Sequence, residues 1–89
     1  MDLSKFLKDK RKLAGLSQGA VAKKLGYTSP QFVSNWERGL SRPPVPTLRK
    51  IAQIYNISMN EMFDVVLQTT IIEVKAELTE KFFKQGKSK

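Results

Sequence analysis

Apolar residues recur every three or four positions along most of the chain, which is the period of an α-helix with one buried face. The first run covers residues 4–14 and ends before Gly15, a residue suited to a left-handed helix stop. Ser17 can cap a second helix over Gln18–Leu25, which Gly26 ends. The apolar faces of these two helices would consist of Leu3, Phe6, Leu7, Leu13, Val21, Ala22 and Leu25.

A third helix is predicted for Pro30–Arg38, although a proline stands at its front. In the first turn a proline costs little, because the N–H there has no partner within the helix and the fixed φ already suits it. Thr28 and Ser29 can both cap this helix, and Thr28 precedes Gln31 at the spacing of a capping box. Gly39 follows as a left-handed cap.

Two more helices follow an extended loop, SRPPVP at 41–46, where residues before proline avoid the helical region. The fourth helix begins at Pro46 or Thr47, and the fifth follows Ser58, whose capping-box partner would be Glu61. The buried positions predicted for these helices are Leu48, Ile51, Ala52, Ile54 and Tyr55 in the fourth and Met62, Phe63 and Val66 in the fifth.

The C-terminal part of the chain permits two interpretations. Residues 64–74 are rich in β-branched side chains and could form a strand. Thr70 and Glu73, however, have the spacing of another capping box, and apolar residues then recur at helical spacing, which favours a sixth helix over about 70–84. We therefore expect a domain over residues 1–67, a segment for self-association over 68–85, and a disordered tail over 86–89.

Composition excludes several classes of protein. The 89 residues fit one small domain, and the absence of cysteine excludes disulfides and thiolate zinc sites. The absence of histidine removes the commonest general base and metal ligand, so we expect no enzyme, no metal and no cofactor. No segment is apolar enough to span a bilayer, and the N-terminus does not resemble a signal peptide. A soluble, cytoplasmic protein is expected.

The charge of the chain points to a polyanionic partner. Sixteen Lys and Arg residues against eight Asp and Glu give a net charge of +8. Such a balance favours nucleic acid first and an anionic membrane surface second.

Two short helices joined by a tight glycine turn, on a basic and all-helical chain, suggest a helix-turn-helix. The segments SQGAVAKKLG (17–26), VSNWERG (33–39) and PTLRKIAQIYNIS (46–58) closely resemble, in order and spacing, the Cro/cI-type helix-turn-helix family, also called the xenobiotic-response-element-like family. The resemblance covers about residues 6–66. It implies an all-α, five-helix, lambda-repressor-like DNA-binding domain, to which the C-terminal helix or strand would be added.

Some of the matched positions have structural roles in that family. Ala22 would face the third helix, where a larger side chain would push the two helices apart, and Val33 and Trp36 would anchor the third helix in the core. An arginine late in the first helix commonly pairs with a glutamate near the end of the third, and here these are Arg11 and Glu37. From the residues alone, the two could also be unrelated solvated charges.

The resemblance places the third helix in the major groove of DNA, where base edges are read. Gln and Asn can pair bidentately with adenine, and a Phe ring can contact a thymine methyl group. Gln31 could instead be the capping-box partner, and Phe32 could belong to the core. The turn is one residue longer than in most members. The alignment of the first base-reading positions with the family can therefore shift by one residue. Counted back from the family's glutamate, the implied base contacts are Ser29, Gln31, Phe32, Ser34 and Asn35.

The resemblance also implies contacts with DNA phosphates, which supply affinity without sequence information. Gln18 lies just inside the second helix and Lys24 near its end, whereas the others lie at the end of the third helix or after it. A lysine such as Lys24 could equally belong to a solvated face. The implied phosphate contacts are Gln18, Lys24, Arg38, Ser41 and Arg42.

Members of the family commonly bind pseudo-palindromic sites as dimers. The C-terminal segment has too many apolar residues for an exposed helix, so we expect Ile71, Val74, Leu78 and Phe82 to form a homodimer interface, unless the segment folds back onto its own domain. The chain is therefore expected to be a sequence-specific DNA-binding transcriptional regulator, a dimeric repressor. Two alternatives are an antitoxin whose C-terminal segment neutralises a toxin, and a helix-turn-helix used only for protein–protein interaction.

Overall fold

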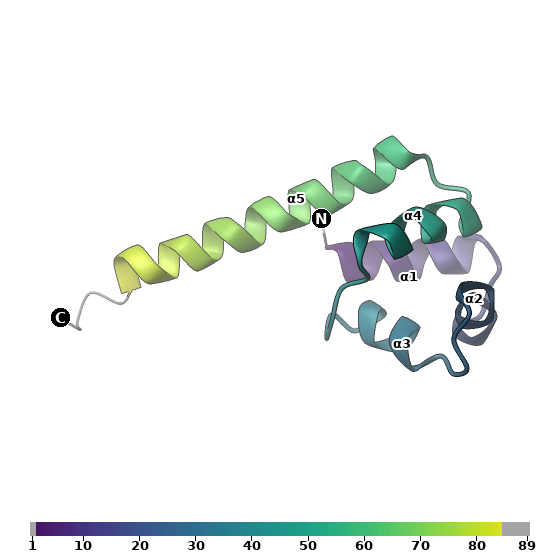
Figure 1. The fold of residues 1–89 in the computed structure, drawn as a ribbon. Coiled ribbons are helices and arrows are strands. Elements are labelled where there is room, and N and C mark those ends of the chain that lie inside the picture. Colours follow the sequence, from purple (N-terminus) through teal and green to yellow (C-terminus); the bar gives the residue numbers. More distant parts are fainter. Residues whose placement is uncertain (1, 85–89) are drawn as a thin grey trace.

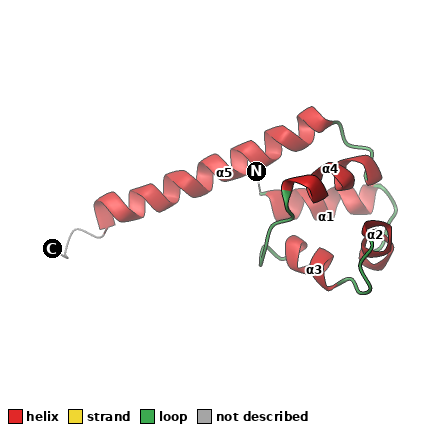
Figure 2. Cartoon of the chain, viewed as in Figure 1, coloured by secondary structure: helices red, strands yellow, loops and turns green. Residues whose placement is uncertain are grey.

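Five helices account for most of residues 2–84, the part of the chain that the computed structural model describes (Figure 1). They are α1 (Leu3–Leu13), α2 (Gln18–Leu25), α3 (Gln31–Glu37), α4 (Val45–Ile54) and α5 (Met59–Thr79), and a π-helical turn, η1 (Glu80–Lys84), continues α5. None of the described residues lies in a strand (Figure 2). The all-α prediction is confirmed, and the strand alternative for 64–74 is wrong.

Side-chain caps decide where the first two helices begin. The carboxylate of Asp2 accepts a hydrogen bond from the backbone N–H of Ser4 at 3.1 Å, so α1 starts one residue earlier than predicted. Ser17 caps α2 as predicted, because its Oγ accepts from the N–H of Ala20 at 3.0 Å. Gly26 then ends α2 in the left-handed region, with φ of 91°. The predicted bounds of α2 are therefore confirmed.

Helix α3 is shorter than predicted. Pro30 is the residue that precedes the helix, not its first helical residue, and its own side chain makes no capping hydrogen bond. The predicted capping box between Thr28 and Gln31 does not form, since the side-chain amide of Gln31 donates to Oδ1 of Asn35 at 2.9 Å instead. At the start of the helix, Oγ of Ser29 accepts a hydrogen bond from the backbone N–H of Gln31, with 3.4 Å between oxygen and nitrogen.

Helix α4 begins at Val45, which places Pro46 within the first helical turn. Ser58 caps α5 as predicted, with its Oγ 3.0 Å from the backbone nitrogen of Glu61. The predicted C-terminal helix is present, but it continues α5 without a break. The capping box at Thr70 is wrong, because the Thr70 hydroxyl lies inside the helix and donates to the carbonyl of Val66 at 2.8 Å.

The core lies between α1 to α4 and the first half of α5. Two residues predicted to be apolar partners of this core are exposed: Leu13 at 79% and Phe63 at 62%. The predicted burial of Phe63 is wrong because Met62, Val65 and Thr69 form the face of α5 that meets the core. The buried hydrophobic residues are Leu3, Phe6, Leu7, Val21, Ala22, Val33, Trp36, Leu48, Ile51, Ala52, Tyr55, Ile57, Met62 and Val65.

The molecule consists of a head, residues 2–70, and an arm, residues 71–84, which is the projecting part of α5 and η1 (Figure 1). Every residue of the arm is exposed, and the principal extents of the molecule are 51 × 27 × 20 Å. The predicted division at 67/68 falls inside α5, whereas residue 85 and the predicted tail, 86–89, lie outside the described residues. Within residues 2–84, no helix combines the length and the hydropathy that crossing a membrane requires.

Candidate nucleic-acid interface

Helix α3 lies at the edge of the head, in Figure 1 on the side of α1 and α4 that is turned away from α5. Its inner face is fixed by Val33 and Trp36, which are 1% and 4% exposed. Ala22 of α2 is also buried, as the packing of two closely spaced helices requires. Apart from Glu37, whose side chain is also buried, the other residues of α3 can face outward, so a rigid core presents a short polar helix at the surface.

The turn between α2 and α3 is anchored by Tyr27, a residue that the sequence analysis did not single out. Its backbone N–H donates to the carbonyl of Ala22 at 2.9 Å. Its ring lies 4.8 Å from that of Phe32 and 6.0 Å from that of Trp36, between centroids. Phe32 remains 53% exposed, so one part of its ring packs on Tyr27 while the rest faces solvent. The aromatic residue just after Gly26 was the signal available in the sequence.

Arg11 and Glu37, which the family resemblance pairs, meet between α1 and the end of α3. Nε of Arg11 donates to Oε2 of Glu37 at 2.6 Å, and Nη2 donates to Oε1 at 2.9 Å. A third hydrogen bond, at 2.9 Å, runs from Nη1 of Arg11 to the carbonyl of Leu16. The two side chains are only 10% and 3% exposed. The bidentate pair therefore holds α3 against α1 at a largely buried position.

Gln18 joins this pair, although the sequence suggested a phosphate contact for it. Its Nε2 donates to Oε1 of Glu37 at 3.0 Å. Burial by itself raises the pKa of Glu37, but the hydrogen bonds from Arg11 and Gln18 and the charge of Arg11 outweigh it, and the net pKa is lowered. The hydrogen bond to Glu37 likewise raises the pKa of Arg11. Both groups are thus held in their charged forms.

The outward face of α3 carries a chain of polar side chains. Nε2 of Gln31 donates to Oδ1 of Asn35 at 2.9 Å, and Nη2 of Arg38 donates to the same oxygen at 2.8 Å. These residues are spaced by four and three positions, so they lie along one side of the helix. Gln31 and Arg38 are exposed, Asn35 and the neighbouring Ser34 are half-buried, and Ser29 is exposed just before the helix. The structure therefore gathers the predicted base-contact residues around one outward-facing strip, whose centre is half-buried.

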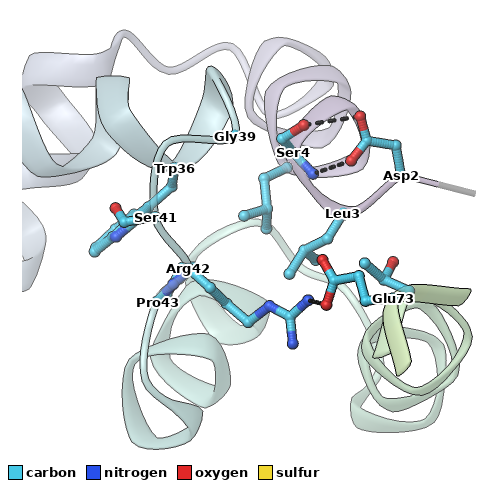
Figure 3. A pocket seen from close by; sticks show the side chains of 11 residues that line it. Asp2, Leu3, Ser4, Trp36, Gly39, Ser41, Arg42, Pro43 and Glu73 are labelled. Carbon is cyan, nitrogen blue, oxygen red and sulfur yellow. Dashed lines mark hydrogen bonds and ion pairs between the residues drawn. The ribbon is translucent and has the colours of Figure 1, made fainter. Parts of the chain in front are cut away.

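The predicted phosphate contacts are less uniformly placed. Lys24 on α2 and Arg38 and Ser41 beyond α3 are exposed. Arg42 instead reaches toward α5, where its guanidinium donates to Oε1 of Glu73 and, at 3.1 Å, to Oγ1 of Thr70. Figure 3 shows this side chain in a pocket between the start of α1, the α3–α4 loop and α5. In the free protein, Arg42 is thus engaged by α5.

Charge is distributed unevenly between the two parts of the molecule. The head contains eleven Lys and Arg residues against five Asp and Glu residues. The arm contains three of each sign. The excess of positive charge on the described residues therefore belongs to the head, which is the part that also presents α3.

The similarity to known proteins lies in the head, the part of the chain that presents α3. A family model described as helix-turn-helix matches residues 7–62, which covers α2, α3 and α4 entirely. The chain belongs to the helix-turn-helix family. It is of the Cro/cI type, and its five-helix, lambda-repressor-like fold carries an additional helical extension at the C-terminal end. The family is one of DNA-binding transcription regulators.

Two relatives share this helix-turn-helix region. The HTH-type transcriptional regulator ImmR of Bacillus subtilis (strain 168) is 40% identical over 58 residues, which cover 65% of this chain and 45% of the relative. The chain thus spans less than half the length of that relative. The ImmF control region 10 kDa protein of Bacillus phage phi105 is 39% identical over 75 residues, covering 84% of this chain and 77% of the relative. No solved structure shows significant similarity.

Proposed function

We propose that this helix-turn-helix protein is a sequence-specific, cytoplasmic transcriptional regulator that acts as a repressor, binding a pseudo-palindromic operator as a homodimer. The observation that carries the proposal is the outward-facing polar strip of Gln31, Asn35 and Arg38 on a helix packed into a basic head. Rigid presentation of polar side chains is what base recognition in the major groove requires. The names of the relatives, a transcriptional regulator and a control region protein, support a regulatory role.

Contacts with DNA would divide into two kinds. Base edges would meet the residues on and before α3, namely Ser29, Gln31, Phe32, Ser34 and Asn35. Phosphates would meet residues around that helix, namely Gln18, Lys24, Arg38, Ser41 and Arg42. The half-exposed ring of Phe32 is suited to a thymine methyl group, since its other side is already packed against Tyr27. Arg42 would have to exchange Glu73 for a phosphate.

The homodimer would form through the arm and the adjoining part of α5. Ile71, Val74, Leu78 and Phe82 are between 46% and 73% exposed, which is unusual for a row of large apolar side chains. The same row continues toward the head through Phe63 and Leu67, at spacings of three or four residues. This apolar row runs on the side of α5 opposite to Met62, Val65 and Thr69, so a second copy could cover it without disturbing the core.

Repression would follow from occupancy alone. A dimer that covers an operator blocks access to the DNA beneath it, and this needs only the binding surface of the two heads. The basic head would make association depend on ionic strength, because each phosphate contact releases bound counterions. The arm, which has no excess charge over residues 71–84, would contribute dimerisation without adding to that dependence.

Selection from a random double-stranded DNA library tests the proposal directly. We expect the full chain to enrich a pseudo-palindrome whose half-sites lie about one helical turn, roughly 34–36 Å, apart. We also expect the affinity for that site to fall steeply as salt is raised. A library that shows no enrichment, or an affinity insensitive to salt, would overturn the proposal.

A further inference from the structure

In the polar strip on α3, the donor and the acceptor of each hydrogen bond can be assigned from the chemistry of the side chains. A guanidinium group has only donors, so the atom of Asn35 that lies 2.8 Å from Nη2 of Arg38 must be the carbonyl oxygen. The atom of Gln31 that lies 2.9 Å from the same oxygen must then be its amide nitrogen. Arg38 therefore fixes the orientation of both side-chain amides.

Asn35 is left with an unequal set of free groups. Its Oδ1 accepts two hydrogen bonds, which use both lone pairs of a carbonyl oxygen. Its Nδ2 has no hydrogen-bond partner among residues 2–84, so two N–H donors remain available. Arg38 also keeps most of its donors. The centre of the strip thus offers donors to a groove and no free acceptor.

This pattern does not suit the usual partner of an asparagine. Bidentate pairing with adenine requires the side chain to donate to N7 and to accept from the N6 amino group. The second of these bonds would need Oδ1, which Gln31 and the positively charged Arg38 already occupy. Guanine presents two acceptors, N7 and O6, on its major-groove edge, and both can be met by N–H donors.

We infer that Asn35 acts as a donor that selects guanine in each half-site, with Arg38 as the positioning residue that prevents it from selecting adenine. The inference rests on the proposed function and specifies how the same surface discriminates between bases. Gln31 contributes by completing the coordination of Oδ1, while its own carbonyl oxygen stays directed away from Asn35.

The test compares library selections with the full chain as wild type, Asn35→Ala, Asn35→Asp and Arg38→Met. The position whose preference disappears in Asn35→Ala identifies the base that Asn35 contacts. We expect wild type to enrich guanine there. Asn35→Asp keeps an acceptor for Gln31 and Arg38 but replaces the free amino group with oxygen, so it should lose the preference for guanine.

The quantity compared is the ratio of the affinities for two sites that differ only at that position, guanine against adenine. A ratio removes the general weakening that an added negative charge on α3 causes. We expect the ratio to fall about 10- to 100-fold in Asn35→Asp, as for the loss of a specific base contact. In Arg38→Met, one lone pair of Oδ1 becomes free to accept from the amino group of adenine, and the ratio should shift toward adenine. Thermal unfolding of each variant shows whether the head remains folded.

Two results would overturn the inference while leaving the proposed function intact. One is enrichment of adenine by the wild type at the position identified by Asn35→Ala. The other is an unchanged guanine-to-adenine ratio in a folded Asn35→Asp variant. Absence of any enriched sequence with the wild type would be a different failure, because it would overturn sequence-specific DNA binding itself.

Discussion

The guanidinium of Arg11 and the carboxylate of Glu37 join the first helix to the end of the third through two hydrogen bonds, 2.6 and 2.9 Å long. The residues are 26 positions apart in the chain, and their side chains are almost fully removed from solvent. Since α3 has only seven residues, its direction depends on such tertiary contacts more than on its own hydrogen bonds. The pair therefore helps determine how α3 is presented.

Removing one partner of this pair should destabilise the protein strongly. We expect Arg11→Met to lower the free energy of unfolding by about 3 kcal/mol, because a buried carboxylate would lose its counter-charge. The double variant Arg11→Met/Glu37→Met should recover most of that loss, since neither charge then remains buried. Urea denaturation followed by circular dichroism measures both. The exposed pair of Lys5 and Asp9 supplies a control, for Lys5→Met should cost less than about 1 kcal/mol. Equal losses of unfolding free energy in Arg11→Met and Lys5→Met would contradict this expectation.

The same pair predicts a dependence of stability on pH. The pKa of Glu37 is lower in the folded protein than its ordinary value of 4.5, so the unfolded chain takes up the proton first as the pH falls. The stabilisation from Glu37 is therefore complete above pH 4.5 and is lost as the pH falls through the lowered pKa. In Glu37→Gln, the unfolding free energy should depend less steeply on pH in this acid range. Parallel curves for the two proteins would show that Glu37 has the same proton affinity in both states.

Much of the fold could be predicted because its determinants are local. The side chain of Ser17 caps α2, and that of Ser58 caps α5, within three residues of their own positions. The left-handed glycine at position 26 marks the end of α2 equally locally. What the sequence did not reveal was the continuity of α5, because β-branched residues and the Thr70–Glu73 spacing imitate a new start. Thr70 instead bonds back to Val66 within one long helix.

The details of the candidate interface could not be predicted from local patterns. Arg42 is a basic residue after α3, and only the course of α5 brings Glu73 to it from 31 positions away. Gln18 is diverted to Glu37 for the same reason, since the meeting of α2 with the end of α3 is a tertiary event. Tyr27 fills the longer turn by packing its ring on Phe32, a contact that helical periodicity does not encode.

Two glycines of the α2 region should respond to substitution in opposite directions. Gly26 has φ of 91°, and a Cβ added there would meet nothing within 4 Å, so only backbone strain opposes an alanine. We expect Gly26→Ala to cost about 1 kcal/mol. Gly19 lies inside α2, and a Cβ there would be 3.9 Å from Oγ of Ser17, an ordinary contact. Gly19→Ala should stabilise by about 0.5–1 kcal/mol. Thermal denaturation distinguishes the two, and a loss in both would contradict the assignment.

Glu73 should compete with DNA for Arg42. If Arg42 contacts a phosphate, Glu73→Gln should raise the affinity for DNA of any sequence by releasing the guanidinium from its ion pair. Glu77→Gln removes the same charge from the arm, where Glu77 pairs with Lys81, and serves as the control. Arg42→Ala should weaken all sites and reduce the salt dependence by about one phosphate contact. Fluorescence anisotropy over a range of salt concentrations measures each. Equal affinities for the two glutamine variants would exclude competition at Arg42.

The apolar row of α5 should control the oligomeric state. Leu78 is 48% exposed, so Leu78→Glu leaves the core of the head intact while placing a charge in the proposed interface. Ala76→Glu adds the same charge two positions away, which is the opposite side of the helix. In sedimentation equilibrium we expect dimers for the wild type and Ala76→Glu, and monomers for Leu78→Glu. The affinity for DNA should be high for the wild type and Ala76→Glu and low for Leu78→Glu, because two joined heads bind a palindrome with a much higher effective concentration than separate ones.

A dimeric Leu78→Glu variant would show that the arm is not the interface. A monomeric wild type would exclude the homodimer and leave the apolar row of α5 without a self-partner, which is the situation that the antitoxin alternative requires.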